Sequence, residues 1–415
     1  MAGGKGTRIS SIASDIPKPM IRIGDKPVLQ LEIESLKKQG FHDFIITISH
    51  LGHVIRDYFG DGSDFGVNIE YYNEEKPLGN AGALFELRDR LTEDFLLING
   101  DVLFEFDANR FVEYHRKKGG LVTLFTHPNS HPYDSGLIIA DNNCCVTRWL
   151  SKEDERPLYY RNRVNAGIHI LSPKVLENRI DKEKIDLDRD VLKPLCGKGV
   201  MYAYDSTEYV KDMGTPERYE QVSRDLLSGK VERRSLSHQQ KAIFLDRDGT
   251  INRYVGFLRR IDQFELLPHV AEAIRMINDS DYLAIVVTNQ PVIARGEVSF
   301  EELSEIHMKM ETLLGKEGAY IDGLYFCPHH PDSGFEGEVK QLKIVCDCRK
   351  PKPGMLLKAA EDYNIDLNQS YMIGDGDNDM GAGSAAGCKC IRIDRDGDLS
   401  EAVRQVLSEK NEEDC

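Results

Sequence analysis

Two aspartates follow an apolar segment in the second half of the chain, in the sequence KAIFLDRDGTIN (241–252). The segment 241–246 has the pattern of a buried strand, so we expect Asp246 and Asp248 at its carboxyl end, where ligands bind in open α/β sheets. There one carboxylate can attack phosphorus and the second can act as general acid and base. The pair therefore indicates phosphoryl-group chemistry, with an ordinary Asp-Gly turn after a strand as the alternative.

Three further segments carry residues that suit the same chemistry. Thr288 ends the strand pattern VVTN, and its hydroxyl can bind a phosphoryl oxygen. Lys350 in CRKPKPGM precedes a predicted helix and can neutralise a phosphoryl group. Asp375 ends YMIGD, with Asp379 one turn later, and such carboxylates suit Mg²⁺. Together, in this order and each at the end of an element, these segments strongly favour a phosphatase.

This set resembles the haloacid dehalogenase (HAD) superfamily over residues 241–408. The resemblance implies that Asp246 forms an aspartyl-phosphate, and that Asp248 protonates the leaving sugar oxygen and then activates water. It also implies that Mg²⁺ is held by Asp246, Asp375 and the backbone carbonyl of Asp248. Thr288 and Lys350 would grip the phosphoryl oxygens, and the expected substrate-binding residues around them are Asn289, Gln290, Arg349 and Asp379.

A Cys/His group lies between these motifs. Cys327 and His329 are two residues apart, as are Cys346 and Cys348. Three thiolates and one imidazole can close a tetrahedral Zn²⁺ site without an open catalytic position, so we expect a structural zinc ion. The adjacent His330 remains an alternative ligand.

The zinc loop, together with TNQ (288–290), IARG (293–296) and GFLRRIDQFELLP (256–268), resembles D,D-heptose 1,7-bisphosphate phosphatases. The related histidinol-phosphate phosphatases share the zinc loop and are the alternative. Arg295 favours the heptose family, because it suits the second phosphate of a bisphosphate. The chain departs from that family at Pro291–Val292, where Ser-Gly is more frequent.

The first half opens on a glycine-rich segment, AGGKGTR (2–8). Consecutive backbone N–H groups in such a loop can wrap a triphosphate. The predicted nucleotide-binding residues of this loop are Gly3, Gly4, Gly6, Thr7 and Arg8.

Further polar residues of the first half stand beside stiff or glycine-containing segments. Lys18 lies between two prolines, Asp101 ends the strand pattern LLINGD, and Asp212 precedes a helix start in YVKDMGTP. Two carboxylates at separate strand ends can share the Mg²⁺ ions that bridge a nucleotide's phosphates. We expect Gly79, Asn80 and Gly82 near the base, and Asn165 and Gly167 near the sugar.

These elements resemble the sugar-1-phosphate nucleotidyltransferases over residues 1–227. The resemblance implies that a sugar-1-phosphate oxygen attacks the α-phosphorus of a nucleoside triphosphate and releases pyrophosphate. Asp101 and Asp212 would hold Mg²⁺, and Lys18 would contact phosphate. Asn80 stands where the family often has Thr. The alternative is a domain that binds nucleotide without transferring it.

Apolar periodicity predicts two Rossmann-like, three-layer α/β domains. We expect a transferase at 1–227, a polar linker at 228–240 and a phosphatase at 241–415. Expected strands are 44–49, 67–72, 95–100, 121–127, 136–140, 165–172, 200–204, 241–246, 283–289, 371–375 and 390–394; expected helices are 28–40, 81–91, 108–119, 268–279 and 300–315, with another after Pro216.

The charge composition limits the classes of binding partner that we expect. The 53 Lys+Arg and 69 Asp+Glu give a net charge of −16, which argues against nucleic acid or an anionic membrane as partner. No run approaches roughly 18 apolar residues and no signal-peptide pattern is present, so a cytoplasmic protein is expected. The sequence does not indicate an oligomeric state.

The two activities fit one pathway. A phosphatase that removes the C7 phosphate of a heptose 1,7-bisphosphate leaves a heptose 1-phosphate, which a nucleotidyltransferase can use. The expectation is a bifunctional enzyme of nucleotide-heptose biosynthesis, acting on sugar phosphates and a nucleoside triphosphate. GTP is favoured by pathway logic alone. An inactive transferase-like domain is the alternative.

The glycine loop begins one residue after Met1. In the family, an apolar strand of about five or six residues precedes this loop inside the sheet. We therefore expect either a true start upstream or a weakened transferase domain, because an absent interior strand leaves two sheet edges unpaired.

Overall fold

The computed structural model describes residues 16–177, 180 and 182–413. They form two compact units. Unit 1 comprises residues up to 127, 136–151 and 165–235, and unit 2 comprises 128–135, 152–164 and the residues from 236 onward. Within the described ranges, no helix is both long and apolar enough to cross a membrane.

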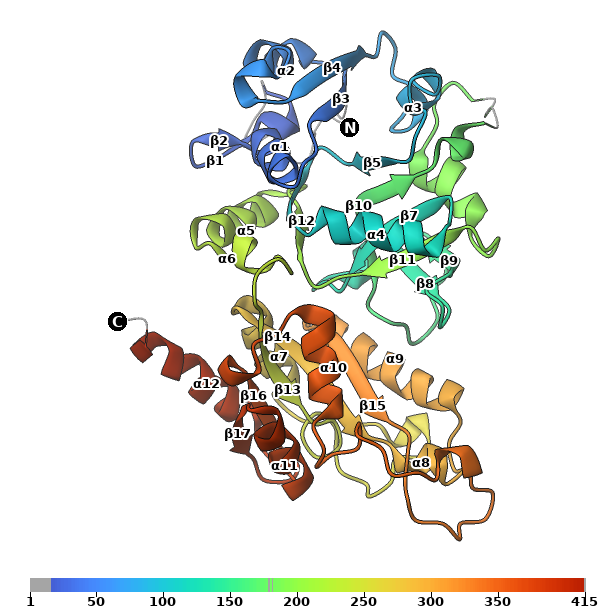
Figure 1. The fold of residues 1–415 in the computed structure, drawn as a ribbon, viewed down its shortest axis with the longest axis vertical. Coiled ribbons are helices and arrows are strands. Elements are labelled where there is room, and N and C mark those ends of the chain that lie inside the picture. The colour runs from blue at the N-terminus through green and yellow to red at the C-terminus, as the bar shows by residue number, and fades with distance from the viewer. Residues whose placement is uncertain (1–15, 178–179, 181, 414–415) are drawn as a thin grey trace. The chain divides into compact units, whose positions relative to one another are not determined.

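Unit 2 is built on a five-stranded sheet in the order β15–β14–β13–β16–β17, with every neighbouring pair parallel (Figure 1). The bounds are β13 Lys241–Leu245, β14 Tyr282–Asn289, β15 Gly323–Cys327, β16 Tyr371–Gly374 and β17 Lys389–Arg392. The helices are α7 Val270–Asp279, α8 Pro291–Ala294, α9 Phe300–Lys316, α10 Gly354–Tyr363, α11 Asp377–Ala386 and α12 Leu399–Glu413.

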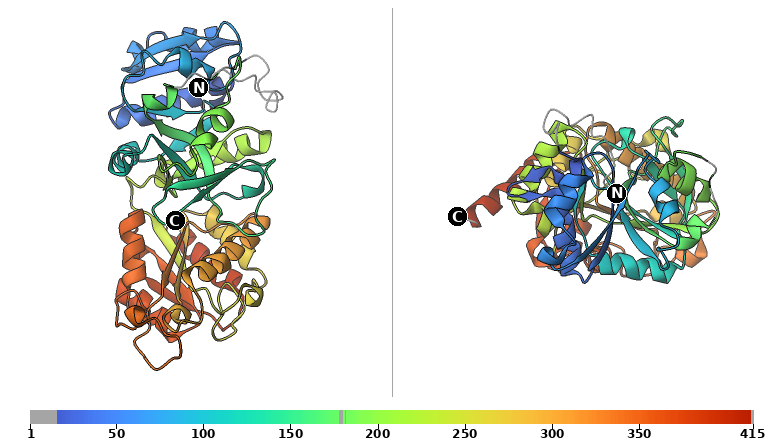
Figure 2. Two further views of the ribbon diagram at one scale, coloured as in Figure 1. Left: turned by 90° about the vertical axis from the view of Figure 1, so that its right-hand side faces the viewer. Right: turned by 90° about the horizontal axis from the view of Figure 1, so that it is seen from above.

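Both faces of this sheet are buried, which explains its continuous apolar strands. On β13, Ile243 and Leu245 pack with α7, α9 and α12, whereas Ala242 and Phe244 pack with α10 and α11. Helices therefore cover the sheet on both sides (Figure 2). This confirms the predicted three-layer α/β architecture of the second half.

The carboxyl ends of these strands meet at one edge of the sheet. Asp246 follows β13, Thr288 lies near the end of β14, Cys327 ends β15, and Asp375 follows β16. Residues from separate parts of the sequence thereby reach the same edge, where ligands of parallel sheets bind.

Unit 1 contains a mixed sheet in the order β11–β7–β10–β8–β9, with β5 also paired to β10. The β11–β7 pair is parallel, and the β10–β5 and β8–β9 pairs are antiparallel. Among the described residues, its other strands form three further pairs, β1–β2, β3–β4 and β6–β12. The strands are β1 Arg22–Ile23, β2 Lys26–Pro27, β3 Asp43–Ile48, β4 Asn68–Asn73, β5 Phe95–Ile98, β6 Val102–Glu105, β7 Val122–His127, β8 Leu137–Ala140, β9 Val146–Leu150, β10 Val164–Leu171, β11 Met201–Asp205 and β12 Tyr209–Asp212. The helices are α1 Val28–Lys38, α2 Gly52–Phe59, α3 Gly82–Glu86, α4 Ala108–Lys118, α5 Pro216–Leu227 and α6 Lys230–Arg233.

Two predicted segments differ from the structure. The helix expected over 81–91 is only the five-residue α3, which ends at Glu86. The segment 228–240, expected as an irregular linker, begins with the short helix α6, whose Val231 is buried against β6, β12 and α5 residues. A single buried valine is too little apolar periodicity to predict a helix from sequence.

The pairing of β3 and β5 concerns the strand that is expected before the glycine loop. Among the described residues, β3 pairs only with β4, and β5 pairs only with β10. The glycine loop lies outside the described residues, so the expectation of an additional strand stays a prediction.

Placing an apolar strand of about six residues directly before Met1 is expected to raise the Tm of the full chain and its transfer activity, because a strand added to a sheet contributes further ladder hydrogen bonds. Thermal unfolding and pyrophosphate release measure the two effects. A Gly/Ser extension of equal length is the control and is expected to change neither. Equal results for both extensions would contradict the expectation.

Candidate active sites

Lys350 occupies the centre of the unit 2 site. Its Nζ lies 2.6 Å from an oxygen of Asp246, 2.6 Å from an oxygen of Asp379 and 2.7 Å from the Val287 carbonyl oxygen. The side chain of Lys350 is only 2% exposed. Burial opposes its charge, but Asp246 and Asp379 outweigh that effect and raise the pKa of Lys350 above its ordinary value. The lysine is therefore a fixed cation beside the predicted nucleophile.

Asn289 holds the backbone of this lysine. Its side-chain oxygen accepts from the Lys350 N–H at 3.0 Å, and its Nδ2 donates to the Lys350 carbonyl at 3.0 Å. Asn289 was predicted to bind substrate. Both the oxygen and the nitrogen of its side-chain amide bind the backbone of Lys350, so its observed contact is with this residue.

The carboxylate of Asp246 lies in a buried acidic cluster. Burial, reinforced by Asp379 and Asp248 and opposed by Lys350, raises the pKa of Asp246 to about 7. Oxygens of Asp246, Asp375 and Asp379 all lie within 4.8 Å of one another. Several carboxylates at this spacing are a donor set that fits Mg²⁺.

Asp248 is held by donors from three residues. Arg247 Nη2 lies 2.9 and 2.8 Å from its two carboxylate oxygens, Gln290 Nε2 donates at 2.8 Å, and Asn252 Nδ2 donates at 3.1 Å. Gln290 Nε2 also lies 2.8 Å from the Thr288 hydroxyl. Gln290, predicted to bind substrate, thus links the predicted acid–base residue with the predicted phosphoryl-binding threonine.

Arg247 is fully buried, and its Nη1 lies 3.1 Å from His307 Nε2 on α9. Burial and the Arg247 charge lower the pKa of His307 well below its ordinary value, so its neutral ring accepts this hydrogen bond. Sequence reasoning missed both residues. Arg247 stands between the two aspartates and could have been noticed, whereas His307 has no local motif.

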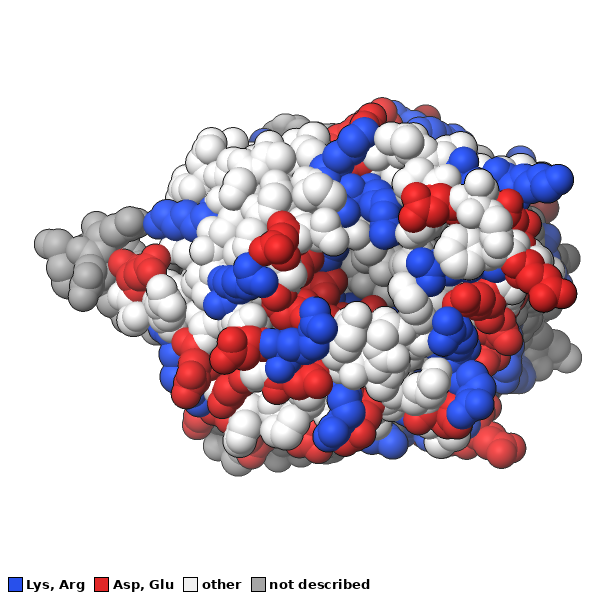
Figure 3. Space-filling model, turned by 90° about the horizontal axis from the view of Figure 1, so that it is seen from below, with Lys and Arg blue, Asp and Glu red and all other residues white. Residues whose placement is uncertain are grey.

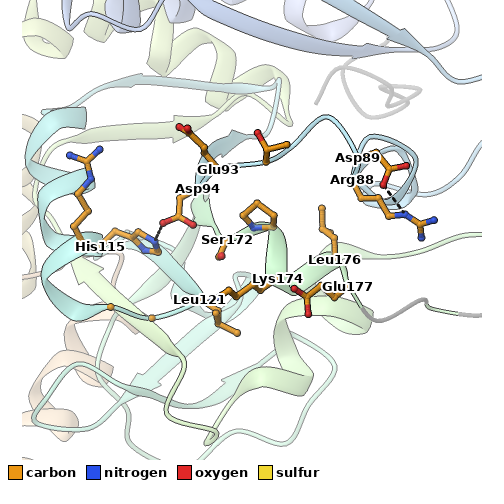
Figure 4. Close-up of a pocket in the computed structure, with 15 residues that line it drawn as sticks. Arg88, Asp89, Glu93, Asp94, His115, Leu121, Ser172, Lys174, Leu176 and Glu177 are labelled. Atoms are coloured by element: carbon orange, nitrogen blue, oxygen red, sulfur yellow. Dashed lines mark hydrogen bonds and ion pairs between the residues drawn. The ribbon is translucent and has the colours of Figure 1, made fainter.

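The unit 2 site contains a cavity of about 230 Å³. The predicted site residues that line it are Asp246, Asp248, Thr288, Asn289, Gln290, Arg349, Lys350, Asp375 and Asp379. Tyr254 and Arg395, which were not predicted, also line it. A larger cavity of about 780 Å³ lies in unit 1 and contains none of the predicted residues (Figure 4). Its Asp94 and His115 pair with each other, as Figure 4 shows, so cavity size does not mark the chemistry.

Arg295 lies outside that lining. Its guanidinium carbon is 4.0 Å from the ring centroid of Phe257 and 4.5 Å from that of Phe335. Its Nε is buried and has no hydrogen-bond partner among the described residues. The two rings hold this cation at the border of the site through Phe257, which does line the cavity.

The predicted Cys/His cluster is assembled. The sulfur atoms of Cys327, Cys346 and Cys348 lie 3.2 to 3.5 Å apart, and His329 Nδ1 lies 3.3 Å from the Cys348 sulfur. Ligands of a tetrahedral zinc ion are separated by about 3.8 Å, because Zn–S bonds are about 2.3 Å long. His330 instead turns Nδ1 to the backbone N–H of Asp332. The geometry therefore favours His329 as the imidazole of this cluster.

In unit 1, the two predicted metal-binding aspartates are brought together by strand pairing. Asp212 at the end of β12 is opposite Val102 at the start of β6, and the Met213 N–H donates to the Asp101 carbonyl. Lys18 Nζ lies 2.9 Å from Asp101 Oδ2. The predicted phosphate-binding cation is therefore close to the predicted metal-binding acids. Arg218, which was not predicted, lies 2.9 Å from Asp212.

The predicted base-binding turn packs against residues 185–187. A Cβ on Gly79, whose φ is +85°, would come 2.3 Å from the Ile185 carbonyl oxygen. The Asn80 side-chain oxygen accepts from the Leu187 N–H at 2.7 Å. Gly82 begins α3, and a Cβ there would lie 2.3 Å from Leu78 Cβ. The observed contacts of this turn are therefore with the chain itself.

The predicted sugar-binding pair forms a compact turn. The side-chain oxygen of Asn165 accepts from the Gly167 N–H at 3.3 Å and lies 3.0 Å from His169 Nε2. Burial lowers the pKa of His169 to about 3, so its ring is neutral and Nε2 donates. The predicted residues Gly3, Gly4, Gly6, Thr7 and Arg8 lie outside the described part of the chain.

Comparison with known proteins adds family membership to this geometry. The nucleotidyl transferase family model matches residues 1–229, which is more than half of the chain. The chain belongs to the nucleotidyl transferase family. A HAD-hydrolase-like model also matches residues 347–410.

The chain also belongs to the family of D-glycero-beta-D-manno-heptose-1,7-bisphosphate 7-phosphatases. It is 46% identical to that enzyme from Pasteurella multocida (strain Pm70) over 150 residues, covering 36% of this chain and 79% of the relative. It is 47% identical to that of Escherichia coli (strain K12) over 148 residues, covering 35% of this chain and 74% of the relative.

Among solved structures, HddC from Yersinia pseudotuberculosis is 28% identical, with a TM-score of 0.47, and covers 54% of this chain and 96% of its own. D,D-heptose 1,7-bisphosphate phosphatase from B. bronchiseptica, complexed with magnesium and phosphate, is 31% identical, with a TM-score of 0.36, and covers 41% of this chain and 99% of its own.

Asp246→Asn is expected to abolish phosphatase activity, since an amide cannot act as the nucleophile, and to leave nucleotidyl transfer intact. Phosphate release and pyrophosphate release measure the two activities. Loss of both in a folded variant would contradict two separate sites.

The same variant tests the electrostatics of Asp246. Because its pKa is raised to about 7, the folded state holds this proton to a higher pH than the unfolded chain does, and stability is lost as the pH rises from about 4 to 7. In chelator at pH 8, we expect Asp246→Asn to have a Tm at or above that of the unmodified protein, with the difference shrinking toward pH 5. A lower Tm at pH 8 would show that the ionised carboxylate stabilises the fold.

Proposed function

We propose that unit 2 hydrolyses the C7 phosphate of D-glycero-D-manno-heptose 1,7-bisphosphate, and that unit 1 transfers a nucleotidyl group to the resulting heptose 1-phosphate. The two families to which the chain belongs support this pairing, because the product of the first reaction is a substrate for the second. The single observation that carries the phosphatase half is the buried Asp246–Lys350–Asp379 cluster at the sheet edge. We assign the transferase to 1–227, the connection to 228–240 and the phosphatase to 241–415.

In the hydrolytic reaction, Asp246 attacks phosphorus, the bond from phosphorus to the sugar oxygen breaks, and an aspartyl-phosphate forms. Asp248 gives a proton to the leaving oxygen and then takes one from the water that releases phosphate. Lys350 and Thr288 hold phosphoryl oxygens, and Lys350 is ready for this because its charge persists when buried. Asp246, Asp375 and the Asp248 carbonyl would hold Mg²⁺, which would supply positive charge to the phosphoryl group.

For the second phosphate of the substrate, we propose Arg295. A guanidinium between two aromatic rings is held in place and keeps its N–H groups for an anion. Local cations of this kind suffice for a small phosphorylated molecule. Basic and acidic side chains intermingle on the face in Figure 3, which fits a small ligand better than a polyanion.

A structural zinc ion bound by Cys327, His329, Cys346 and Cys348 would join the end of β15 to the segment that leads into Lys350. Because Arg349 and Lys350 follow Cys348 directly, the zinc ion would fix both residues at the cavity.

Zinc removal offers a direct test. Metal analysis of the purified protein is expected to give one zinc per chain, and Cys348→Ser is expected to lower both zinc content and phosphatase kcat. Cys388→Ser, which changes a buried cysteine outside the cluster, is the matched control and is expected to retain zinc. Protein with full activity and no zinc would remove this assignment.

In unit 1, we propose that Asp101 and Asp212 hold Mg²⁺ and that Lys18 contacts a phosphate of the nucleotide. The heptose 1-phosphate oxygen attacks the α-phosphorus, and the bond to pyrophosphate breaks. The preferred nucleotide is proposed to be GTP, from the order of the two reactions alone.

A product assay tests the whole proposal. The full chain is incubated with D-glycero-D-manno-heptose 1,7-bisphosphate and each of the four nucleoside triphosphates in turn, and phosphate, pyrophosphate and nucleotide-heptose are measured. We expect phosphate in every reaction and a nucleotide-heptose with GTP. A higher kcat/KM for histidinol phosphate than for the bisphosphate would overturn the phosphatase assignment, and phosphate without pyrophosphate would indicate an inactive transferase domain.

A further inference from the structure

Arg395 makes a direct contact with the acidic cluster of unit 2. Its Nε lies 2.6 Å from Asp375 Oδ2. The Asp375 side chain is 7% exposed, whereas that of Arg395 is 54% exposed. A surface arginine therefore reaches inward to a buried carboxylate that we assign to Mg²⁺.

Contacts of the loop after β17 hold Arg395 in this position. The Asp396 N–H donates to the Gly249 carbonyl at 2.9 Å, and the Asp396 side chain accepts from the Tyr254 N–H at 2.7 Å. The Arg395 guanidinium carbon lies 4.0 Å from the centroid of the Tyr254 ring. Two hydrogen bonds and one stacking contact thus tie Arg395 to the segment that follows Asp248.

Gly249 leaves the space that this arrangement needs. Its φ is +92°, and a Cβ there would lie 2.9 Å from Asp375 Oδ2 and 3.3 Å from Arg395 Cγ. A larger residue would separate the carboxylate from the guanidinium or strain the turn.

Among the described residues, hydrogen bonds and ion pairs engage all but two of the carboxylate oxygens of Asp246, Asp375 and Asp379. Lys350 takes Asp246 Oδ1 and Asp379 Oδ1, and the Gly376 N–H takes Asp379 Oδ2. Arg395 takes Asp375 Oδ2. Asp246 Oδ2 and Asp375 Oδ1 remain, and they belong to the two side chains assigned to the metal.

We propose that Arg395 is a positioning residue that fixes the Asp375 carboxylate with Oδ1 turned toward the Mg²⁺ site. The inference rests on the proposed phosphatase function of unit 2. Hydrogen bonds to a ligating carboxylate typically contribute a factor of about 10 to 100 in metal affinity, because they hold the ligand in its binding orientation. Arg395 is monodentate here, so it can hold one oxygen while the other binds metal.

The test measures Mg²⁺ binding without substrate. Isothermal titration calorimetry is carried out with MgCl₂ on the full chain in an Asp101→Asn/Asp212→Asn background, which leaves the unit 2 site. Arg395→Gln is expected to weaken the Kd for Mg²⁺ about 10-fold or more. Arg392→Gln is the matched control, because Arg392 makes an ion pair of the same 2.6 Å length with Asp377, both exposed. It is expected to leave the Kd unchanged.

A second pair of variants tests whether the stacking of Arg395 on the Tyr254 ring affects Mg²⁺ binding. Tyr254→Phe keeps the ring and is expected to bind Mg²⁺ as the background does, whereas Tyr254→Ser is expected to weaken binding in the same direction as Arg395→Gln. Unchanged affinity in Arg395→Gln overturns the inference while the proposed function stands. Tighter binding also overturns it, since Arg395 would then compete with the metal. If the background chain binds no Mg²⁺, both the inference and the proposed phosphatase mechanism fail.

Discussion

The unit 2 site depends on a buried ammonium group between two carboxylates. An unpaired lysine at the position of Lys350 would lose most of its hydration without compensation, and unpaired carboxylates at Asp246 and Asp379 would do the same. The three groups therefore offset part of one another's lost hydration only if their backbones are held accurately in place. Asn289 supplies that precision, since it binds both backbone groups of Lys350 from the end of the neighbouring strand.

The same constraint explains why the Cys/His cluster lies where it does. Cys327 ends β15, and Cys348 precedes Lys350 by two residues. A long segment with few apolar residues separates them, and it could not place a lysine accurately by its own packing. Four ligands around one ion would give that segment a fixed end point beside the sheet. Asp248 is held in a comparable way, because Arg247 binds its carboxylate and the buried His307 ring in turn binds Arg247.

In unit 1, the acidic residues Asp101 and Asp212 lie in a more exposed setting than the acids of unit 2. Asp101 and Asp212 each have a cation, Lys18 and Arg218, in a partly exposed setting where screening weakens such pairs. They are joined through the β6–β12 pairing rather than through a buried network. A site of this kind tolerates exchange of its counter-ions, as the nucleotide binding and release proposed for it would require.

The sequence by itself determined the α/β class and the central strands β13, β14 and β16. It also predicted Asp246, Asp248, Thr288, Lys350 and Asp375 as site residues, because each lies at the end of a local pattern that can be recognised alone. It also predicted which cysteines and histidines form the Cys/His cluster. The four-residue strands β6 and β12 were not among the predicted strands.

Only the tertiary structure decided which side chains meet. Arg247 and His307 are 60 residues apart, and Arg395 and Asp375 are 20 apart, so no local spacing relates them. The structure likewise favoured His329 over its neighbour and turned Asn289 and Gln290 toward protein partners. The physical reason is that strand patterns fix where a chain segment ends, whereas pairing between polar side chains depends on distances that the topology of the whole sheet creates.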